Sequence, residues 1–302
     1  MQKNLFAPNM KMSLSTKFLT FVIIAASFWA CKEIPPFINY SPDIELTKDT
    51  CYVVTDIPAK EEKSVLIEDV SGVRCVNCPE AAEIAHELKK DHPGRVVVVT
   101  LHPTSNANLT TTISGNDTLN SQEAENIYQN LIGGAQGLPT GSVDRKKYTG
   151  ESRIAVSPTS WTGYTNDQMA TDARVNLELN ITASKADRTA KLDVKTTFTE
   201  EDASPVFLTI MVLESELVQP QITRSGQVDD YVHHDILRYT HTNYSGLKLA
   251  DDVTKGLVCE KGFELTIPEK YNLDHVAIAV MVNKVDADNK EILQVKEVLY
   301  TE

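Results

Sequence analysis

The order of hydrophobic and polar positions gives the first part of the chain the pattern of an α/β domain. An apolar run over residues 63–72 predicts a strand, and apolar residues at helical spacing over residues 79–90 predict an amphipathic helix. The continuous apolar run over residues 95–101 is typical of a parallel strand that is buried on both faces. Together these segments predict a β-α-β unit.

The segments that follow extend this domain. The polar stretch over residues 102–120 predicts a long surface connection, and residues 121–132 have the pattern of a helix. A Gly-Leu-Pro-Thr sequence then precedes a predicted hairpin, whose arms are residues 141–146 and 152–156. Residues 158–171 predict the closing helix.

From about residue 172 the periodicity becomes that of strands. Six runs alternate apolar with polar residues or are rich in Val, Ile, Leu and Thr. These runs are residues 173–183, 188–199, 205–215, 261–268, 275–285 and 291–300. They predict an all-β antiparallel sandwich of the immunoglobulin-like kind over residues 172–302, after an α/β domain over residues 58–171.

The N-terminus has the pattern of a secretory signal. Lysines precede an apolar core over residues 18–30, which is shorter than the roughly 20 residues that span a bilayer. The small residue before Cys31 gives an ending similar to a bacterial lipobox, which predicts a lipoprotein signal peptide over residues 1–30 and lipidation of Cys31. The alternative is a plain signal peptide cut nearby, with Cys31 free. Residues 31–57 then form a tether and N-terminal extension.

Composition and charge narrow the function classes. The 302 residues are 41% hydrophobic and 24% charged, which is typical of a globular protein. The net charge of −13 argues against nucleic acid as a partner, because its phosphates would be repelled. Outside the cytoplasm disulfides persist, and four cysteines remain besides Cys31. They are Cys51, Cys75, Cys78 and Cys259. The sequence leaves open whether Cys51 pairs with Cys259.

The most informative motif is the Cys-x-x-Cys of Cys75 and Cys78, which follows a predicted strand and precedes a predicted helix. This placement is the geometry of a thioredoxin-type redox site. The helix N-terminus favours the thiolate, which is the species that attacks a disulfide. Asn77 and Glu80 have the spacing of a capping box, which places Cys75 just outside the first turn. We interpret the α/β region as a thioredoxin-like domain.

Each residue of the predicted site has its own role. Cys75, as the more exposed sulfur, is the nucleophile, and Cys78 resolves the mixed disulfide. Asp69 lies under the pair as the proton acceptor for Cys78, which requires a pKa raised through burial. The charge of Arg74 helps to hold the Cys75 thiolate. Pro139, preceded by a cis peptide bond, keeps the facing backbone free to pair with a substrate strand and excludes metal from the thiols.

The motif has other interpretations. A second Cys-x-x-Cys for structural zinc is absent from the sequence, and Pro79 after the motif excludes c-type haem attachment, so no cofactor is expected. Two weaker hypotheses are copper bound by His102 with the cysteines, and a metal bound by His233, His234 and His241. A different function class is a surface binding or adhesion protein with a permanently closed Cys-x-x-Cys disulfide. Redox activity requires a reducible, accessible pair, whereas pure binding predicts a buried or very stable one.

Four segments carry a resemblance to a known family. They are Ala30-Cys31, Val65 to Glu80, Gly137-Leu138-Pro139 and Tyr231 to Arg238. In these segments the chain resembles the outer-membrane protein twenty-eight family of lipoproteins from Bacteroides-type bacteria. The resemblance implies a secreted lipoprotein anchored in the outer membrane, on its periplasmic face or at the cell surface, with a thioredoxin-like domain. It implies no particular reaction.

The site residues also match the wider thioredoxin superfamily. Asp69, Cys75, Cys78 and Pro139 match four of its positions, whereas Arg74 stands where a tryptophan usually precedes the first cysteine. The expected function is thiol–disulfide exchange in the cell envelope. The expected partners are protein thiols or disulfides, together with the membrane through the lipidated N-terminal cysteine.

Overall fold

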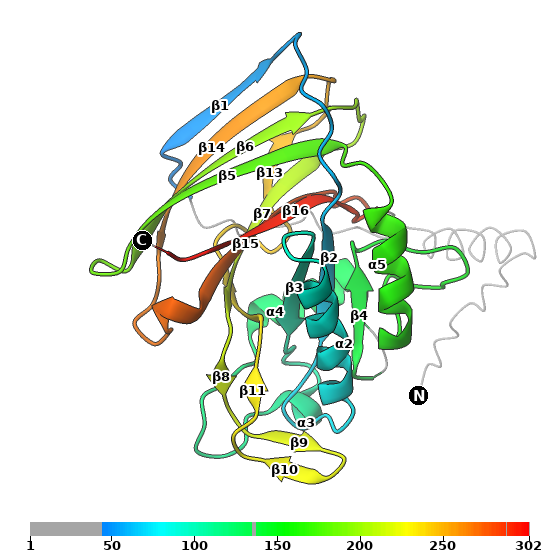
Figure 1. The fold of residues 1–302 in the computed structure, drawn as a ribbon, viewed down its shortest axis with the longest axis vertical. Coiled ribbons are helices and arrows are strands. Elements are labelled where there is room, and N and C mark those ends of the chain that lie inside the picture. Colours follow the sequence, from blue (N-terminus) through cyan, green and yellow to red (C-terminus); the bar gives the residue numbers. More distant parts are fainter. Residues whose placement is uncertain (1–43, 135–136, 288, 302) are drawn as a thin grey trace, which may run out of the picture. The chain divides into compact units, whose positions relative to one another are not determined.

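The computed structural model describes residues 44–134, 137–287 and 289–301 (Figure 1). The predicted signal peptide over residues 1–30 and the predicted lipidation site at Cys31 lie outside the described residues. Within the described part of the chain, no helix has the length and apolar character needed to cross a membrane.

The first elements of the fold form the predicted β-α-β unit. They are β2 (Val65–Val70), α2 (Cys78–Asp91) and β3 (Val96–Leu101). The two strands pair in parallel, and every residue in both of them is buried. The continuous apolar runs predicted these strands correctly, because packed side chains cover both faces of the sheet at this point.

Short helices and one strand follow this unit. They are α3 (Ala107–Thr110), α4 (Gln122–Ile127) with its π-helical continuation (Tyr128–Ile132), β4 (Thr140–Val143), and a 3-10 turn (Pro158–Ser160) that leads into α5 (Trp161–Met169). β4 pairs antiparallel with β2, and the peptide bond between Leu138 and Pro139 is cis, as predicted. The predicted second arm of a hairpin, residues 152–156, is wrong. Only an isolated bridge between Gly141 and Val156 forms before the chain turns into α5.

Strands dominate the rest of the chain. They are β5 (Val175–Ser184), β6 (Thr189–Phe198), β7 (Val206–Glu214), β13 (Leu247–Ala250), β14 (Leu257–Thr266), β15 (Val276–Asn283) after a 3-10 turn (Leu273–His275), and β16 (Ile292–Leu299). A four-stranded antiparallel sheet has the order β1-β14-β6-β5, where β1 is Lys48–Val53. It packs against the second sheet over a core that includes Leu192, Ile210 and Ile278.

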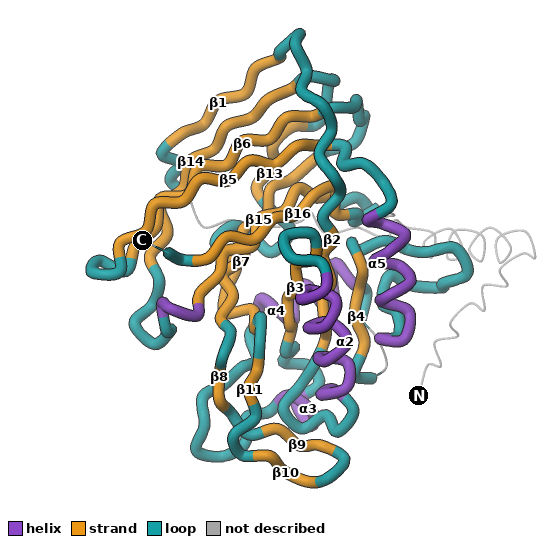
Figure 2. Tube along the Cα trace, viewed as in Figure 1, coloured by secondary structure: helices purple, strands orange, loops and turns teal. Residues whose placement is uncertain are grey.

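The second sheet has eight strands and joins the two sequence regions. Its order is β16-β15-β7-β12-β3-β2-β4, with β13 also paired to β7. β12 (Ile236–Thr240) pairs antiparallel with β7 and parallel with β3, where Ile236 lies opposite Thr100. Strands of the regions 58–171 and 172–302 therefore share one sheet (Figure 2). The fold is mostly β, with mixed and antiparallel sheets.

The pairing of the remaining two cysteines is a disulfide at the edge of the four-stranded sheet. Cys51 of the edge strand β1 lies directly opposite Cys259 of β14, and the two are bonded. All six residues of β1 are exposed, whereas Cys259 is buried. The disulfide therefore fixes an edge strand that contributes little to the core.

Between β7 and β12 the chain leaves the sheet over residues 215–235, which we call the excursion (Figure 1). Its strands are β8 (Leu217–Val218), β9 (Gln221–Thr223), β10 (Gly226–Val228) and β11 (Val232–His233). β8 pairs with β11, and β9 pairs with β10 as a hairpin. Each of these strands has only two or three residues, which is too short for a hydrophobic period to predict.

Alternation along β2 decides which of its side chains reach the predicted site. Val65 and Ile67 belong to the core under α2 and α5, so Asp69 points to the same face. Glu68 points to the opposite face, where its Oε1 lies 2.6 Å from Nη2 of Arg145. Both side chains of that ion pair are fully buried. The carboxylate at 68 is therefore structural, and the one at 69 belongs to the site.

Candidate functional site

The two cysteines of the motif form a disulfide at the start of α2. The backbone N–H of Cys75 donates to the carbonyl of Gly72 (3.0 Å), and that of Cys78 donates to the carbonyl of Cys75 (3.2 Å). α2 begins at Cys78, so the prediction that Cys75 lies just outside the helix is confirmed. The positive end of the helix dipole therefore faces the disulfide.

The predicted capping box is wrong. The side chain of Asn77, the N-cap residue, makes no capping hydrogen bond. Its Oδ1 instead accepts a hydrogen bond from Nε of Arg224 (2.9 Å), and Glu80 forms an ion pair with the same guanidinium (2.7 Å). A residue of the excursion therefore engages both side chains that the local spacing had assigned to the helix cap.

The disulfide is buried. Cys75 is 3% exposed and Cys78 is 1% exposed, so Cys75 is slightly the more exposed of the two residues and both are buried in this closed arrangement. On one side the chain around α3 covers the loop, and the backbone N–H of Arg74 donates to the carbonyl of Leu109 (2.8 Å). On the other side lies the excursion. Gly72 is required here, because a Cβ at this position would lie 2.5 Å from the carbonyl oxygen of Leu109.

Asp69 shares a cavity with Cys78, and its carboxylate has no hydrogen-bond partner among the described residues. Its side chain is fully buried, and neither carboxylate oxygen is paired with another described residue. Burial raises the pKa of Asp69 to about 7, because water that would stabilise its charge is excluded. Asp69 and Cys78 line the same cavity. A carboxyl with this pKa can give and take a proton near neutral pH, as its predicted role requires.

Pro139 lies next to the end of β2 from which the chain continues to the disulfide. Its neighbour Thr140 pairs with Val70, the last residue of β2, and the chain runs from that end of β2 to Cys75. Pro139 itself is half-buried. The cis proline, the buried carboxyl and the segment leading to the disulfide therefore all lie at this end of β2.

Arg74 lies directly before Cys75 and its side chain contacts the segment after α3, while its effect on the Cys75 thiolate stays a prediction. Its side chain is exposed, and Nε donates to the carbonyl of Thr111 (2.8 Å) while Nη2 donates to the carbonyl of Thr112 (3.3 Å). These carbonyls belong to the chain that follows α3. In this structure the guanidinium fastens that segment to the loop before the disulfide.

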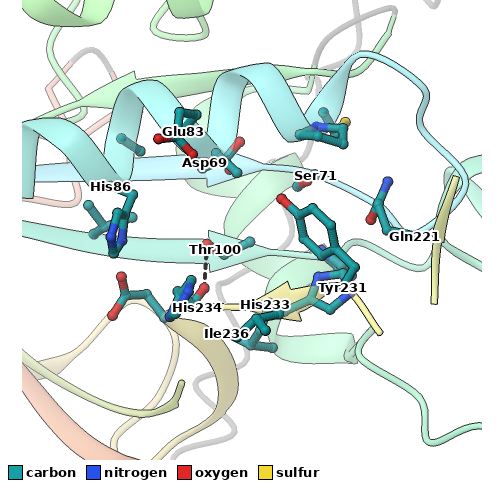
Figure 3. A pocket seen from close by; sticks show the side chains of 18 of the residues that line it. Asp69, Ser71, Glu83, His86, Thr100, Gln221, Tyr231, His233, His234 and Ile236 are labelled. Carbon is teal, nitrogen blue, oxygen red and sulfur yellow. Dashed lines mark hydrogen bonds between the residues drawn. The ribbon is translucent and has the colours of Figure 1, made fainter. Parts of the chain in front are cut away.

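A cavity of about 370 Å³ opens between α2 and the segment that follows the β9–β10 hairpin (Figure 3). Asp69 and Cys78 reach it from the sheet and the start of α2, Glu83 and His86 from further along α2, and Tyr231 from the excursion. The ring of Tyr231 points across the cavity toward β2. Burial, and next to it the charge of Asp69, raises the pKa of the Tyr231 hydroxyl. Sequence reasoning assigned no role to these additional residues, although the segment from Tyr231 onward was among those that carried the family resemblance.

Of the histidines considered as metal ligands, His102, His233 and His234 line the cavity, whereas His241 packs against a phenylalanine of β14. His102 and His233 are buried with ring centroids 6.2 Å apart, and burial lowers their pKa values to about 3 and about 4. The ring of His234 is tilted against that of His86, with centroids 4.9 Å apart. Across residues 44–301 as described, no group of three or more His, Cys, Asp or Glu side chains could hold a metal ion.

Comparisons with known proteins connect the fold to envelope proteins. The family model described as "Outer membrane protein Omp28" matches residues 125–302. The matched segment contains the cis proline, the excursion and the sandwich strands, and the two cysteines of the motif lie before it. No curated protein matches the chain.

Three solved structures are similar to the chain. HBP35 of Porphyromonas gingivalis has a TM-score of 0.62 at 18% identity, over 80% of this chain and 76% of that one. Protein AGR_C_4864 from Agrobacterium tumefaciens has a TM-score of 0.52 at 13% identity, over 81% and 97%. A domain of the outer membrane lipoprotein Omp28 from Porphyromonas gingivalis has a TM-score of 0.28 at 14% identity, over 42% and 87%. The first two show a shared fold.

Proposed function

Since the chain belongs to the Omp28 family of outer membrane proteins, we propose that it is an envelope lipoprotein that exchanges disulfides with secreted proteins through Cys75 and Cys78. One observation carries this proposal. A closed disulfide at a helix start shares a cavity with a buried, unpaired carboxyl, that of Asp69, whose pKa is about 7. A purely structural disulfide has no use for an unsatisfied carboxylate, which destabilises the fold where it lies.

The chemistry follows from these positions. A thiolate of a partner protein attacks Sγ of Cys75, a bond forms between the two sulfurs, and the bond between Cys75 and Cys78 breaks. Cys78 leaves as a thiolate and takes the proton of the Asp69 carboxyl, which recovers a proton from solvent. A second partner thiolate then displaces Cys75. The partner dithiol has lost two electrons to become a disulfide, the Cys75–Cys78 pair has gained them, and the reverse sequence is available from the dithiol form.

The finer fold assignment belongs to the same proposal. We regard β2, α2, β3 and β4 as a thioredoxin-like arrangement, supported by the β-α-β connection, the Cys-x-x-Cys at the start of α2 and the cis peptide before Pro139. The lipid on Cys31 would hold the folded part at the membrane. The partners would be protein thiols or disulfides of the cell envelope.

A second candidate function is supported by burial of the pair. Because Cys75 and Cys78 are 3% and 1% exposed, the disulfide also fits a structural crosslink in a surface binding or adhesion protein. The sandwich strands would then provide the recognition surface. The two functions predict different stabilities of the Cys75–Cys78 disulfide against reduction.

Equilibration with glutathione buffers, followed by thiol trapping and peptide mass mapping, measures the reduction potential of the Cys75–Cys78 bond separately from Cys51–Cys259. A potential between about −120 and about −270 mV, the span of catalytic dithiols, supports exchange. A potential below about −300 mV marks a structural bond and favours the binding function. The matched control is Cys75→Ser, which must abolish the assigned signal and leave the Cys51–Cys259 signal unchanged.

A further inference from the structure

The β9–β10 hairpin of the excursion lies against the loop that carries Cys75. Backbone N–H of Ile222 donates to the carbonyl of Val73 at 2.8 Å. In the part of the chain that the structure describes, β9 pairs with β10 and with no other strand, and all three residues of β10 are exposed. Strand pairing therefore does not join the hairpin to either large sheet.

Gln221 makes the most buried of these contacts. Its side-chain Nε2 donates to the carbonyls of Gly72 (3.2 Å), Cys75 (3.1 Å) and Ile222 (3.0 Å), and the residue is 3% exposed. One amide therefore connects the residue that begins the turn, the first cysteine and the hairpin itself. Figure 3 shows Gln221 beside the cavity, at the disulfide end of α2.

Arg224 makes a second, weaker set of contacts at the tip of the hairpin. Its guanidinium binds Asn77 between the two cysteines and pairs with Glu80 on the first turn of α2. Both side chains of the ion pair are 62% exposed, so water competes for this contact and it breaks readily. A segment with few buried contacts opens locally at lower free energy than the body of the fold.

We propose that Gln221 is a positioning residue that holds the β9–β10 hairpin closed over Cys75, and that a partner protein reaches this sulfur only when the hairpin moves aside. This inference rests on the proposed exchange at the Cys75–Cys78 pair. Opening frees the carbonyl of Val73 and removes the Gln221 donor from the carbonyl of Gly72, which keeps its bond from the Cys75 N–H. The partner that fits is an extended polypeptide segment carrying a cysteine, because its backbone N–H groups can replace those donors as an added strand does.

The test measures how fast dithiothreitol reduces each disulfide in the oxidised mature chain, with thiols trapped over time and mapped by mass spectrometry. In Gln221→Ala we expect at least tenfold faster reduction of Cys75–Cys78. The matched control is Gln227→Ala on the same hairpin, whose amide bonds only Asp229 in the described contacts, and we expect the wild-type rate. The Cys51–Cys259 bond should be reduced at one rate in all three proteins.

Two results would overturn the inference. One is a wild-type rate for the Cys75–Cys78 bond in folded Gln221→Ala. The other is an equal acceleration of Cys51–Cys259, which would show general loosening of the fold. If Gln221→Ala does not fold, Arg224→Ala is tested in its place, because this substitution removes only exposed contacts. We then expect about threefold faster reduction of Cys75–Cys78, and an unchanged rate refutes the closing role of the hairpin.

Failure of the inference and failure of the proposed function are distinguishable. Dithiothreitol reduces structural disulfides as well. Faster reduction in Gln221→Ala, together with a reduction potential of the wild-type protein in the structural range, would support the closing role of Gln221 and refute the proposed disulfide exchange. A potential in the catalytic range without faster reduction in Gln221→Ala would support the exchange and refute the closing role. A reduced cysteine-containing peptide in place of dithiothreitol should give an equal or larger acceleration, because a polypeptide needs more room at Cys75.

Discussion

Replacement of Asp69 by Asn gives the most direct test of the electrostatics of the site. The folded carboxyl has a pKa of about 7, against 3.8 for an ordinary aspartate, and burial is the cause. The folded chain therefore binds more protons than the unfolded chain between these pH values. The contribution of Asp69 to stability therefore falls as pH rises from about 4 to about 7, because the unfolded chain loses this proton while the folded chain keeps it. Above pH 7 both states are ionised and the contribution levels off.

The size of the effect follows from these two pKa values. Relative to strongly acidic solution, the titration of Asp69 lowers the free energy of unfolding by about 2 kcal/mol at pH 5 and by about 4 kcal/mol at pH 8. The difference is roughly 2 to 3 kcal/mol. Asn has nearly the same shape and cannot ionise, so its own burial cost is independent of pH. Between pH 5 and pH 8 the stability of Asp69→Asn should therefore rise relative to wild type by roughly 2 to 3 kcal/mol.

The assay is urea unfolding of the oxidised mature chain at both pH values, followed by circular dichroism. The control is Asp252→Asn, because this carboxyl is exposed and remains in water after folding. Its stability difference from wild type should be the same at pH 5 and pH 8. If the relative stability of Asp69→Asn changes by less than about 0.5 kcal/mol across this range, the buried carboxyl does not have the raised pKa, and the proton-transfer role assigned to it fails with it.

Two further predictions concern packing beside the site. Gly141→Ala should destabilise the fold by about 3 kcal/mol in urea unfolding, because the new Cβ would lie 2.2 Å from the carbonyl oxygen of Glu68; Gly163→Ala in α5, which meets nothing within 4 Å, should instead be neutral or slightly stabilising. Arg145→Met should lower the free energy of unfolding by about 4 kcal/mol, because it leaves the buried Glu68 carboxylate without a counter-charge, although the hydroxyl of Ser142 still donates to it; a loss under about 1 kcal/mol would contradict this.

Local patterns predicted much of the secondary structure and half of the site. The strand at 65–70 and the helix after Cys78 were readable because an apolar run and a helical period are properties of a short stretch of chain. The cis bond at Pro139 was predicted from the order of elements that precede it. The burial of both cysteines and the hydrogen bonds of Arg74 to the carbonyls of Thr111 and Thr112 were not predicted, because they depend on segments distant in sequence that fold over the loop.

The sequence by itself determined that this chain carries a Cys-x-x-Cys at the start of a helix, an aspartate on the strand before it and a strand-rich second half, because each is a local pattern. Only the tertiary structure decided that β12 joins both regions in one sheet and that Gln221 donates to the carbonyl of Cys75 from 146 residues away. Only burial gave Asp69 a pKa near 7. Desolvation and long-range hydrogen bonds depend on what surrounds a group in space, and neighbours in sequence do not specify those surroundings.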